Sequence, residues 1–275
     1  MTYHHYNEGQ PIATLPLVFL DLETTGLHVT HGHRICEIAL VRTCGTTIET
    51  SFETLVNPQR MVEAQAFSVN GLRGDILAQA PLFAQIADEV LHFLEGAIVV
   101  AHNAPFDLGF LRREYELLPQ PFSQPLVIDT LPLARRLLRS TSYSLSTLAA
   151  NLQLPSPSHR AMSDVISTIA LFRHLTGLMA ERHISTLRDL MRIQRGIIPG
   201  QTEPEPPPII RQAIHERRRL RIVYRSRSTP APTERIIDPI ELTIERSGLF
   251  LRAYCYLRND MRSFAIEKIE SIELM

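Results

Sequence analysis

The sequence predicts an α/β protein in which a mixed sheet flanked by helices is followed by a second, smaller β-barrel domain. Three observations lead to this prediction. An apolar strand and an antiparallel pair of strands occupy residues 17–58, strands alternate with helices from residue 81 to residue 180, and mainly short strands follow a proline-rich stretch. Antiparallel strands that give way to alternating strands and helices are typical of a mixed sheet covered by helices.

The first elements follow from local patterns. We expect a poorly ordered tail over residues 1–14 and a buried strand over residues 17–22, where a short apolar run is bounded by turn residues. Gly45 suits the turn between the next two strands. Pro81 and Gly96 mark the ends of an amphipathic helix, because proline is favoured where a helix begins and glycine just after its end.

Later elements alternate in the same way. A short strand at residues 97–101 precedes a helix that begins near Pro105, and the strand PLVIDT leads into the helical LPLARRLLR. The helical segment LSTLAANLQL and a long helix within HRAMSDVISTIALFRHLTGLMA, with apolar residues at i, i+4 and i+7, complete this part. We therefore place the first domain at residues 15–180.

A proline-rich stretch separates this domain from the end of the chain. Five prolines lie between residues 199 and 208, too many for a regular element, so we interpret residues 181–208 as a helical and Pro-rich linker. Residues 209–275 contain a short helix and alternating strands with a turn at Asn259-Asp260. This pattern predicts a small β-barrel.

The composition is that of a globular protein. Of 275 residues, 44% are hydrophobic and 21% are charged, and no apolar run approaches the roughly 18 residues that span a bilayer. The N-terminus lacks the pattern of a signal peptide, so we expect a cytoplasmic protein. We also expect the three cysteines to be buried reduced thiols, because their spacing is not that of a metal site; they are Cys36, Cys44 and Cys255.

The charge is distributed unevenly. Residues 209–275 contain 13 Lys and Arg against 9 Asp and Glu, whereas the rest of the chain contains 15 against 20. A basic module favours a nucleic-acid partner, and an acidic body agrees with a metal site built from carboxylates.

Two carboxylates lie at the end of the first strand. In VFLDLETTGL, residues 18–27, Asp21 and Glu23 lie two apart, so a strand points both side chains to one side. Two anions at one spot repel each other and resist burial. The pair therefore indicates a site for a hard divalent metal ion.

Two further stretches combine acids with histidines. In AHNAPFD, His102 and Asn103 close a strand, and Asp107 falls in the first turn of the next helix. In HRAMSD, His159 precedes Asp164 by five residues. On one continuous helix the two side chains would therefore point about 140° apart and would not share a face. We therefore expect His159 on the loop before the helix, where it can lean over a site that Asp164 helps to build.

The stretches FLDLETTGL, VAHNAPFDLGFLRRE and HRAMSD together resemble the three exonuclease motifs of the DEDDh superfamily, which includes the epsilon proofreading subunit of bacterial DNA polymerase III. The resemblance runs from about Leu17 to Gly177 and implies a ribonuclease H-like fold. It also implies that His159 is the general base and that four acids bind the metal. These acids are Asp21, Glu23, Asp107 and Asp164.

The same resemblance implies a reaction. It is that of a 3′–5′ exonuclease that hydrolyses phosphodiester bonds of nucleic acid, single-stranded DNA favoured over RNA, to nucleoside 5′-monophosphates. Two Mg²⁺ or Mn²⁺ ions can clamp the attacking and leaving oxygens, and a histidine can accept a proton from water. Thr24, Thr25 and Gly26 are implied to contact the terminal nucleotide and Asn103 the strand, although a plain turn also explains Gly26 and a helix cap explains Asn103.

The end of the chain resembles a WYL domain, a small Sm- or SH3-like barrel, over about residues 209–275, although LFL stands where Trp-Tyr-Leu is expected. The resemblance implies binding of nucleic acid or a nucleotide-like ligand by Tyr254, Arg258, Arg262 and Phe264. The alternative is that the two rings fill the core and the arginines are solvated. A denser cluster predicts a basic patch; it consists of Arg217, Arg218, Arg219 and Arg221.

Three functions are compatible with these motifs. The first is the exonuclease, the second is a proofreading subunit with a DNA polymerase as partner, and the third is a nucleic-acid-binding regulator that uses the exonuclease fold as a scaffold. The intact acids favour an enzyme. The loop with His28, His31 and His33 is expected to be exposed, because no Cys or acid completes a tetrahedral metal set.

Overall fold

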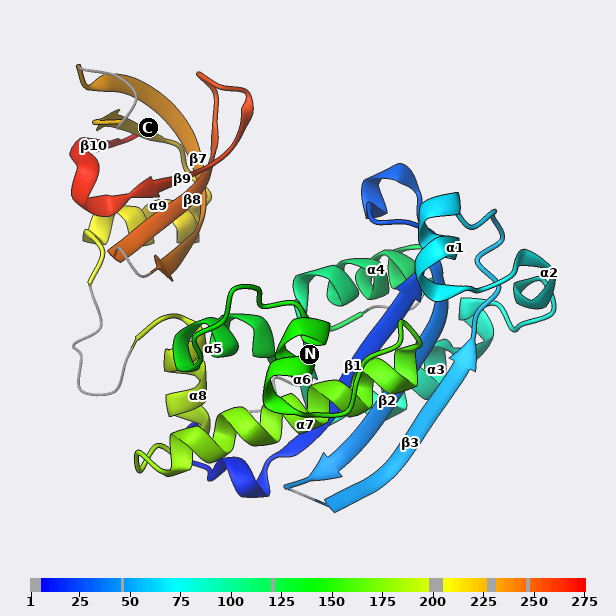
Figure 1. Cartoon of the computed structure of the whole chain (residues 1–275). Helices are drawn as coiled ribbons and strands as arrows, with labels where there is room; N and C mark the ends of the chain where they lie inside the picture. Colours follow the sequence, from blue (N-terminus) through cyan, green and yellow to red (C-terminus); the bar gives the residue numbers. More distant parts are fainter. Residues whose placement is uncertain (1–5, 46, 120–121, 198–204, 227–230, 246–247) are drawn as a thin grey trace. The chain divides into compact units, whose positions relative to one another are not determined.

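The computed structural model describes residues 6–45, 47–119, 122–197, 205–226, 231–245 and 248–275 (Figure 1). The chain divides into two compact units, Met1–Gln194 and Arg195–Met275. Among the described residues, no helix combines the length and the apolar character needed to cross a membrane.

The first unit consists of a mixed sheet and the helices around it (Figure 1). The strands of the sheet are β1 (Pro16–Thr24), β2 (Ile35–Cys44), β3 (Thr47–Leu55), β4 (Ile98–Ala101) and β5 (Val127–Asp129). The helices are α1 (Ala64–Asn70), α2 (Gly74–Leu77), α3 (Phe83–Leu94), α4 (Pro105–Glu116), α5 (Thr130–Leu137), α6 (Leu145–Leu152), α7 (Ala161–Ala180) and α8 (Leu187–Gln194).

The sheet has the strand order β3-β2-β1-β4-β5. β2 pairs antiparallel with β1 and β3, whereas β4 pairs parallel with β1 and β5. Gly45 follows β2 at the predicted turn with a φ of 59°, and a Cβ there would lie 2.1 Å from the backbone oxygen of Ala13, so only glycine fits. The predicted α/β fold with a mixed sheet is confirmed.

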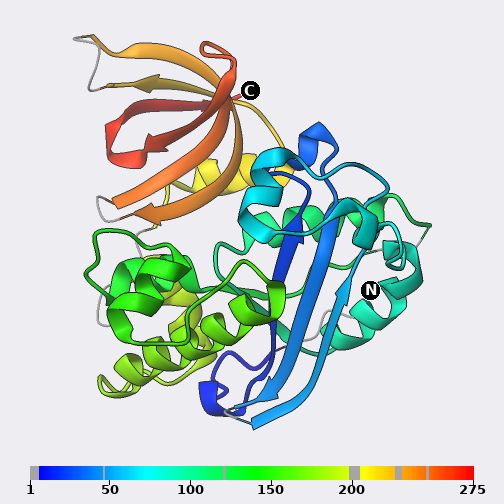
Figure 2. The same ribbon diagram turned by 45° about the vertical axis from the view of Figure 1, so that its right-hand side comes forward.

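Alternating residues of β1 build a core on each face of the sheet. Leu17 and Phe19 face α7, where the Phe19 ring meets Phe172 edge-on at 5.5 Å, and α5, α6 and α8 contribute to the same core. Val18 and Leu20 face α3 and α4. Figures 1 and 2 show these two layers of helices with the sheet between them. Because both faces are covered, β1 is apolar from its start as far as Leu20, and its first charged residue is Asp21.

The segment before β1 is ordered rather than a loose tail where the structure describes it. Ile12 is buried and donates its N–H to the backbone oxygen of Ser185 at 2.8 Å. This expectation for residues 6–14 was wrong, because composition does not show that a short polar segment pairs with a distant one. Residues 1–5 lie outside the described part.

The first unit also extends further than the predicted boundary at residue 180. α8 buries Leu187, Leu190 and Ile193 in the core that α7 shares. The stretch expected to be a linker therefore begins after α8, because the apolar residues of this helix have a core to join.

In the part that the structure describes, the second unit is an open antiparallel sheet with helix α9 packed on it. Its strands follow the order β10-β6-β7-β8-β9, so β9 and β10 form opposite edges and the predicted closed barrel is wrong. Ile210 and Ala213 of the helix pack on the sheet. The elements are α9 (Pro208–Glu216), β6 (Leu220–Tyr224), β7 (Thr233–Glu245), β8 (Gly248–Cys255), β9 (Asp260–Ala265) and β10 (Ile269–Leu274).

Candidate active site

β1 carries two acids to the carboxyl end of its parallel pairing with β4. Asp21 and Glu23 alternate with the buried Leu20 and Leu22, so both project from the same face of the strand, as predicted. The pairing of β1 with β2 shifts register directly after Glu23. Only Thr24 of β1 pairs beyond this irregularity, so the two carboxylates lie close to the carboxyl end of the strand.

Two helices supply the other acids from their first turns. Asp107 of α4 is buried and accepts the backbone N–H of Leu22 at 3.1 Å, which ties α4 to β1 between the two strand acids. Asp164 of α7 accepts the N–H of Ser158 at 2.9 Å and that of His159 at 3.1 Å. The bond of Asp107 therefore joins two distant stretches of the chain, whereas the bonds of Asp164 fix the loop before α7 to the start of the same helix.

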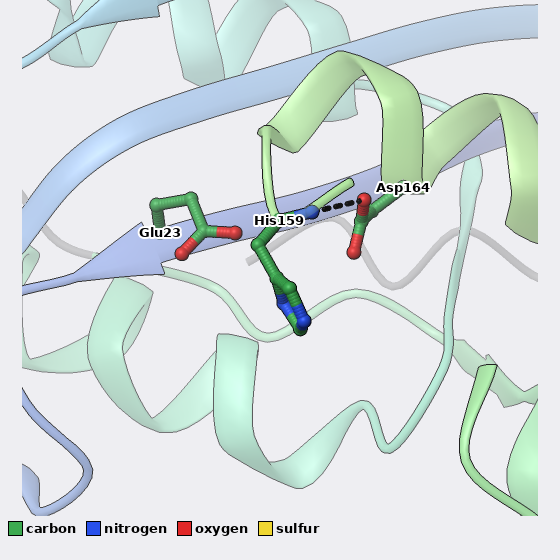
Figure 3. A group of neighbouring side chains, drawn as sticks. All are labelled: Glu23, His159 and Asp164. Atoms are coloured by element: carbon green, nitrogen blue, oxygen red, sulfur yellow. Dashed lines mark hydrogen bonds between the residues drawn. The ribbon is translucent and has the colours of Figure 1, made fainter. Parts of the chain in front are cut away.

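His159 lies on the loop before α7, as predicted, and its side chain is exposed. Its φ is +56°, a conformation that few non-glycine residues adopt. Potential ligand atoms of Glu23, His159 and Asp164 all lie within 4.8 Å of one another. Figure 3 shows the three side chains around this spot, with the hydrogen bond from the His159 backbone to Asp164 dashed.

The acids and His159 line one cavity of about 240 Å³. Thr24 at the end of β1 forms one wall of it together with Gly26 and Leu27, and helix α1 forms another. His102 and Phe106, from the stretch around the start of α4, complete the lining. Its walls thus combine charged, polar and apolar groups.

Burial raises the pKa values of all four acids, and repulsion from neighbouring carboxylates adds to the rise for Asp21, Glu23 and Asp107. Burial raises the pKa of Glu23 from 4.5 to about 8, a hydrogen bond from Asn70 opposes the rise, and the charge of Asp164 adds to it. Burial and then the charge of Asp107 raise the pKa of Asp21 well above its ordinary value. Burial is also the main cause of the raised pKa values of Asp107 and Asp164.

This arrangement fits hard divalent cations. Carboxylate oxygens are the ligands that Mg²⁺ and Mn²⁺ prefer, and a cation among the four acids offsets the repulsion between their charges. The Glu23, His159 and Asp164 group is close enough for one ion. The free cysteines are not part of this group.

The sequence patterns did not single out several groups that shape the site. Glu37 on β2 is 1% exposed and binds Arg160, next to His159. Asp129 at the end of β5 accepts the backbone N–H groups of Asn103 and Leu131, both at 2.9 Å. The position of Glu37 within the apolar run RICEIALV could have indicated a buried carboxylate with a specific partner, because a buried charge needs one.

The predicted substrate residues separate into two groups. Thr24 and Gly26 line the cavity. The Thr25 side chain is fully buried and bonds His33 Nδ1 at 3.1 Å, so it supports the segment from behind and is not available to a nucleotide. Asn103 is exposed and does not line the cavity; its φ of +69° is held by the bond to Asp129.

His33 corrects the expectation that the histidine loop is exposed. It is 2% exposed, and its Nε2 lies 3.1 Å from Glu63 Oε1, just before α1. A Cβ at Gly26 would lie 2.4 Å from the His33 ring, so glycine is required there. His28 and His31 are exposed as predicted. Among the cysteines, Cys36 and Cys255 are buried, but Cys44 is exposed at the end of β2.

The residues predicted to bind a ligand in the second unit are also divided. Phe264 is 2% exposed and packs against Tyr224 in the core, so its ring cannot stack on a base. Tyr254 is half-buried on β8, and Arg258 and Arg262 are exposed at or near the turn between β8 and β9.

Most arginines of the predicted basic patch are paired with acids. Arg219 binds Asp238 at 3.1 Å, and Arg221 lies 3.2 Å from Glu273. Pairs of this kind connect neighbouring strands, so the surface is less basic than the composition indicated. Further ion pairs of this unit involve Arg218, Arg225, Arg252 and Arg262.

The comparisons with known proteins agree with this geometry. The profile of the exonuclease family matches residues 18–172, and that of the WYL domain matches residues 208–274. The chain therefore belongs to the exonuclease family, with a C-terminal WYL domain. The enzyme class predicted from the motifs, a 3′–5′ exonuclease, is confirmed.

Several curated relatives are subunits of a polymerase. The DNA polymerase III subunit epsilon of Rickettsia prowazekii is 31% identical over 70% of this chain and 93% of its own length. That of Salmonella typhimurium is 30% identical over 82% of this chain and 93% of its own. A DNA polymerase III subunit epsilon-like protein of Rhodobacter capsulatus is 37% identical, but the chain spans only 26% of it.

Solved structures show the same fold. Exonuclease X in complex with 5′ overhanging duplex DNA is 29% identical, with a TM-score of 0.50 over 65% of this chain and 99% of that one. E. coli exonuclease I in complex with a dA16 oligonucleotide has a TM-score of 0.55 at 15% identity, over 87% of this chain and 55% of that one, and shows the fold alone.

Proposed function

We propose that the enzyme removes nucleotides one at a time from the 3′ end of single-stranded DNA and releases nucleoside 5′-monophosphates. The observation that supports this most directly is the convergence of two half-buried acids, two buried acids and an exposed histidine on one cavity of about 240 Å³. A cavity of this size suits the terminal nucleotide of a strand. Thr24, Gly26 and α1 would hold the sugar and base.

In the proposed reaction, water attacks the phosphorus of the last phosphodiester bond. His159 accepts a proton from this water, the bond between the phosphorus and the 3′ oxygen of the preceding nucleotide breaks, and that oxygen takes up a proton. The exposed ring of His159 can reach a water molecule, because its backbone, rather than its side chain, makes the bond to Asp164.

We propose two Mg²⁺ or Mn²⁺ ions as cofactors, held by Asp21, Glu23, Asp107 and Asp164. When bound, such ions polarise the phosphate and stabilise the charge that develops on the attacking and leaving oxygens. Asp107 and Asp164 each use one oxygen for backbone N–H groups, so each keeps a second oxygen for a cation.

The test is degradation of end-labelled single-stranded DNA and RNA with Mg²⁺ or Mn²⁺. We expect shortening from the 3′ end that EDTA stops, that Asp21→Ala abolishes, and that His159→Ala slows by about 10²–10⁴-fold. Comparison of the two polymers gives the sugar preference. Shortening that continues in EDTA, or an unchanged rate for His159→Ala, would contradict the proposed mechanism.

A second candidate is proofreading as a subunit of a DNA polymerase. The epsilon subunits of Rickettsia prowazekii and Salmonella typhimurium favour it, because the chain spans 93% of each. Co-purification with a polymerase, and faster removal of a mismatched 3′ end by the complex than by the free chain, would support this role.

We further propose that the WYL domain binds single-stranded nucleic acid or a nucleotide-like ligand, through Tyr254, Arg258 and Arg262. All three lie on β8, on β9 or at the turn between them. Tyr254→Ala is expected to weaken binding of a labelled oligonucleotide by about 1–3 kcal/mol if its ring stacks on a base. Unchanged binding would assign the ring to the packing of the sheet.

A further inference from the structure

We propose that Glu37 and Arg160 are positioning residues that hold His159 in place for proton removal from the attacking water. This inference rests on the proposed function of His159 as the base. It assigns a catalytic consequence to an ion pair outside the four metal-binding acids.

The pair has a close, directed geometry. Glu37 is 1% exposed and lies on β2 opposite Glu23 in the register of the sheet. Arg160 Nε lies 3.1 Å from both carboxylate oxygens of Glu37, and a terminal nitrogen of the guanidinium lies 2.6 Å from Oε1. Glu37 Oε2 also accepts the backbone N–H of Ala161 at 3.0 Å. A planar guanidinium bound in this way has one orientation, which a lysine cannot reproduce.

Two carboxylates thus hold the loop from opposite ends. Asp164 accepts the N–H groups of Ser158 and His159, and Glu37 accepts the guanidinium of Arg160 and the N–H of Ala161. The left-handed backbone of His159 lies between these two anchors. Such a conformation persists only where neighbouring contacts fix it, so loss of either anchor lets the residue relax.

The position of Arg160 favours a role in the reaction over a role in packing. Its side chain is 49% exposed and does not belong to the hydrophobic core. The residue before it is the base, and the helix after it contains Asp164. A shift of the loop by about 1 Å would misplace the imidazole, which typically costs roughly 10²-fold in rate.

The charges of the pair provide a way to separate positioning from electrostatics. Removing Glu37 as an anion weakens the negative potential at the metal site, whereas removing Arg160 strengthens it. Metal affinity should therefore shift in opposite directions in the two variants. If the pair positions His159, the rate falls in both.

The experiment measures single-turnover hydrolysis of a labelled oligonucleotide at saturating Mn²⁺, together with Mn²⁺ affinity and melting temperature. Glu37→Gln keeps a side-chain oxygen that can accept the N–H of Ala161, and Arg160→Gln removes the guanidinium that binds both oxygens of Glu37. We expect both variants to be about 10- to 100-fold slower with substrate affinity within about twofold of the wild type. Arg42→Gln is the control, because Arg42 lies on the same strand as Glu37 but binds the backbone of Phe93 and Glu95 away from the site.

Two readouts distinguish positioning from general loss of structure. Millimolar guanidinium should restore much of the rate of Arg160→Ala and leave the rate of Arg42→Ala unchanged. In a His159→Ala background, Arg160→Gln should cost less than about threefold, because the group it positions is gone.

Two results would overturn the inference. In the first, the rate rises in one of the variants Glu37→Gln and Arg160→Gln and falls in the other, following their metal affinities. In the second, Arg160→Gln lowers the rate by the same factor in the His159→Ala background as in the wild type. Neither result would contradict the proposed role of His159 as the base. An unchanged rate for His159→Ala alone would instead overturn the proposed base, and this inference with it.

Discussion

At the scale of single residues, the acid cluster couples folding to pH. Glu23 is protonated more readily in the folded protein than in the unfolded chain, because burial raises its pKa from 4.5 to about 8. A group whose pKa is raised on folding contributes stability that is complete below the unfolded pKa and is lost as the pH rises through the folded pKa. Asp21, Asp107 and Asp164 shift in the same direction.

We therefore expect the metal-free protein to lose stability as the pH rises from 4.5 to about 8. Glu23→Gln removes one of the titrating groups and should flatten this dependence, although the other three acids leave part of it. Melting temperatures in EDTA across this range measure the effect. Saturating Mn²⁺ is the control, because a bound cation removes the repulsion. Equal pH slopes for the wild type and the variant in EDTA would contradict the assignment to Glu23.

A second residue-scale prediction concerns the contact between Gly26 and His33. The Cβ of Gly26→Ala would lie 2.4 Å from the imidazole, so the loop or the ring must move. We expect a lower melting temperature and weaker substrate binding, since Gly26 lines the cavity. His33→Ala combined with Gly26→Ala opens space for the new methyl group. The double variant should therefore lose less than the sum of the two single variants; simple additivity would show that the two sites are independent.

At the scale of elements, α8 belongs to the exonuclease unit through its apolar face. Leu190 is fully buried in the core beside α7, so Leu190→Ala should destabilise this unit by about 2–5 kcal/mol. Urea unfolding of the full chain, followed by loss of nuclease activity, measures the change. Arg188→Ala on the same helix is the control, because the Arg188 side chain is 61% exposed. An equal effect of both substitutions would mean that α8 is held by something other than its apolar face.

The elements also show how far the sequence alone predicts this protein. The strand acids Asp21 and Glu23, the first-turn position of Asp107 and the loop position of His159 follow from local periodicity, so they could be predicted. The partners of His33 and Glu37 could not, because Glu63 and Arg160 reach them through the fold. The open sheet of the second unit was missed for a similar reason: the pattern of strands shows their number but not whether the edges meet.

At the scale of the whole molecule, net charge is a poor guide to nucleic-acid binding. The second unit is basic in composition, yet its strands carry arginines beside acids on neighbouring strands, as in the pairs of Arg221 with Glu234 and Glu273. An arginine that is paired with acids must break these ion pairs before it can neutralise a phosphate. Only arginines without such partners contribute fully to the release of counterions that drives binding.

Arg258 and Arg221 allow this idea to be tested within one domain. Arg258 is exposed, and its side chain forms no ion pair with any residue that the structure describes, whereas Arg221 has two acidic partners. If the WYL domain recruits the strand, Arg258→Ala should weaken binding of an oligonucleotide and reduce the salt slope by about 1. Arg221→Ala should leave affinity and slope nearly unchanged. Titrations of a labelled strand at several salt concentrations, with the inactive Asp21→Ala background to prevent degradation, provide both numbers. Equal effects would show that composition rather than pairing sets the affinity, and no effect of either would place strand binding in the exonuclease unit alone.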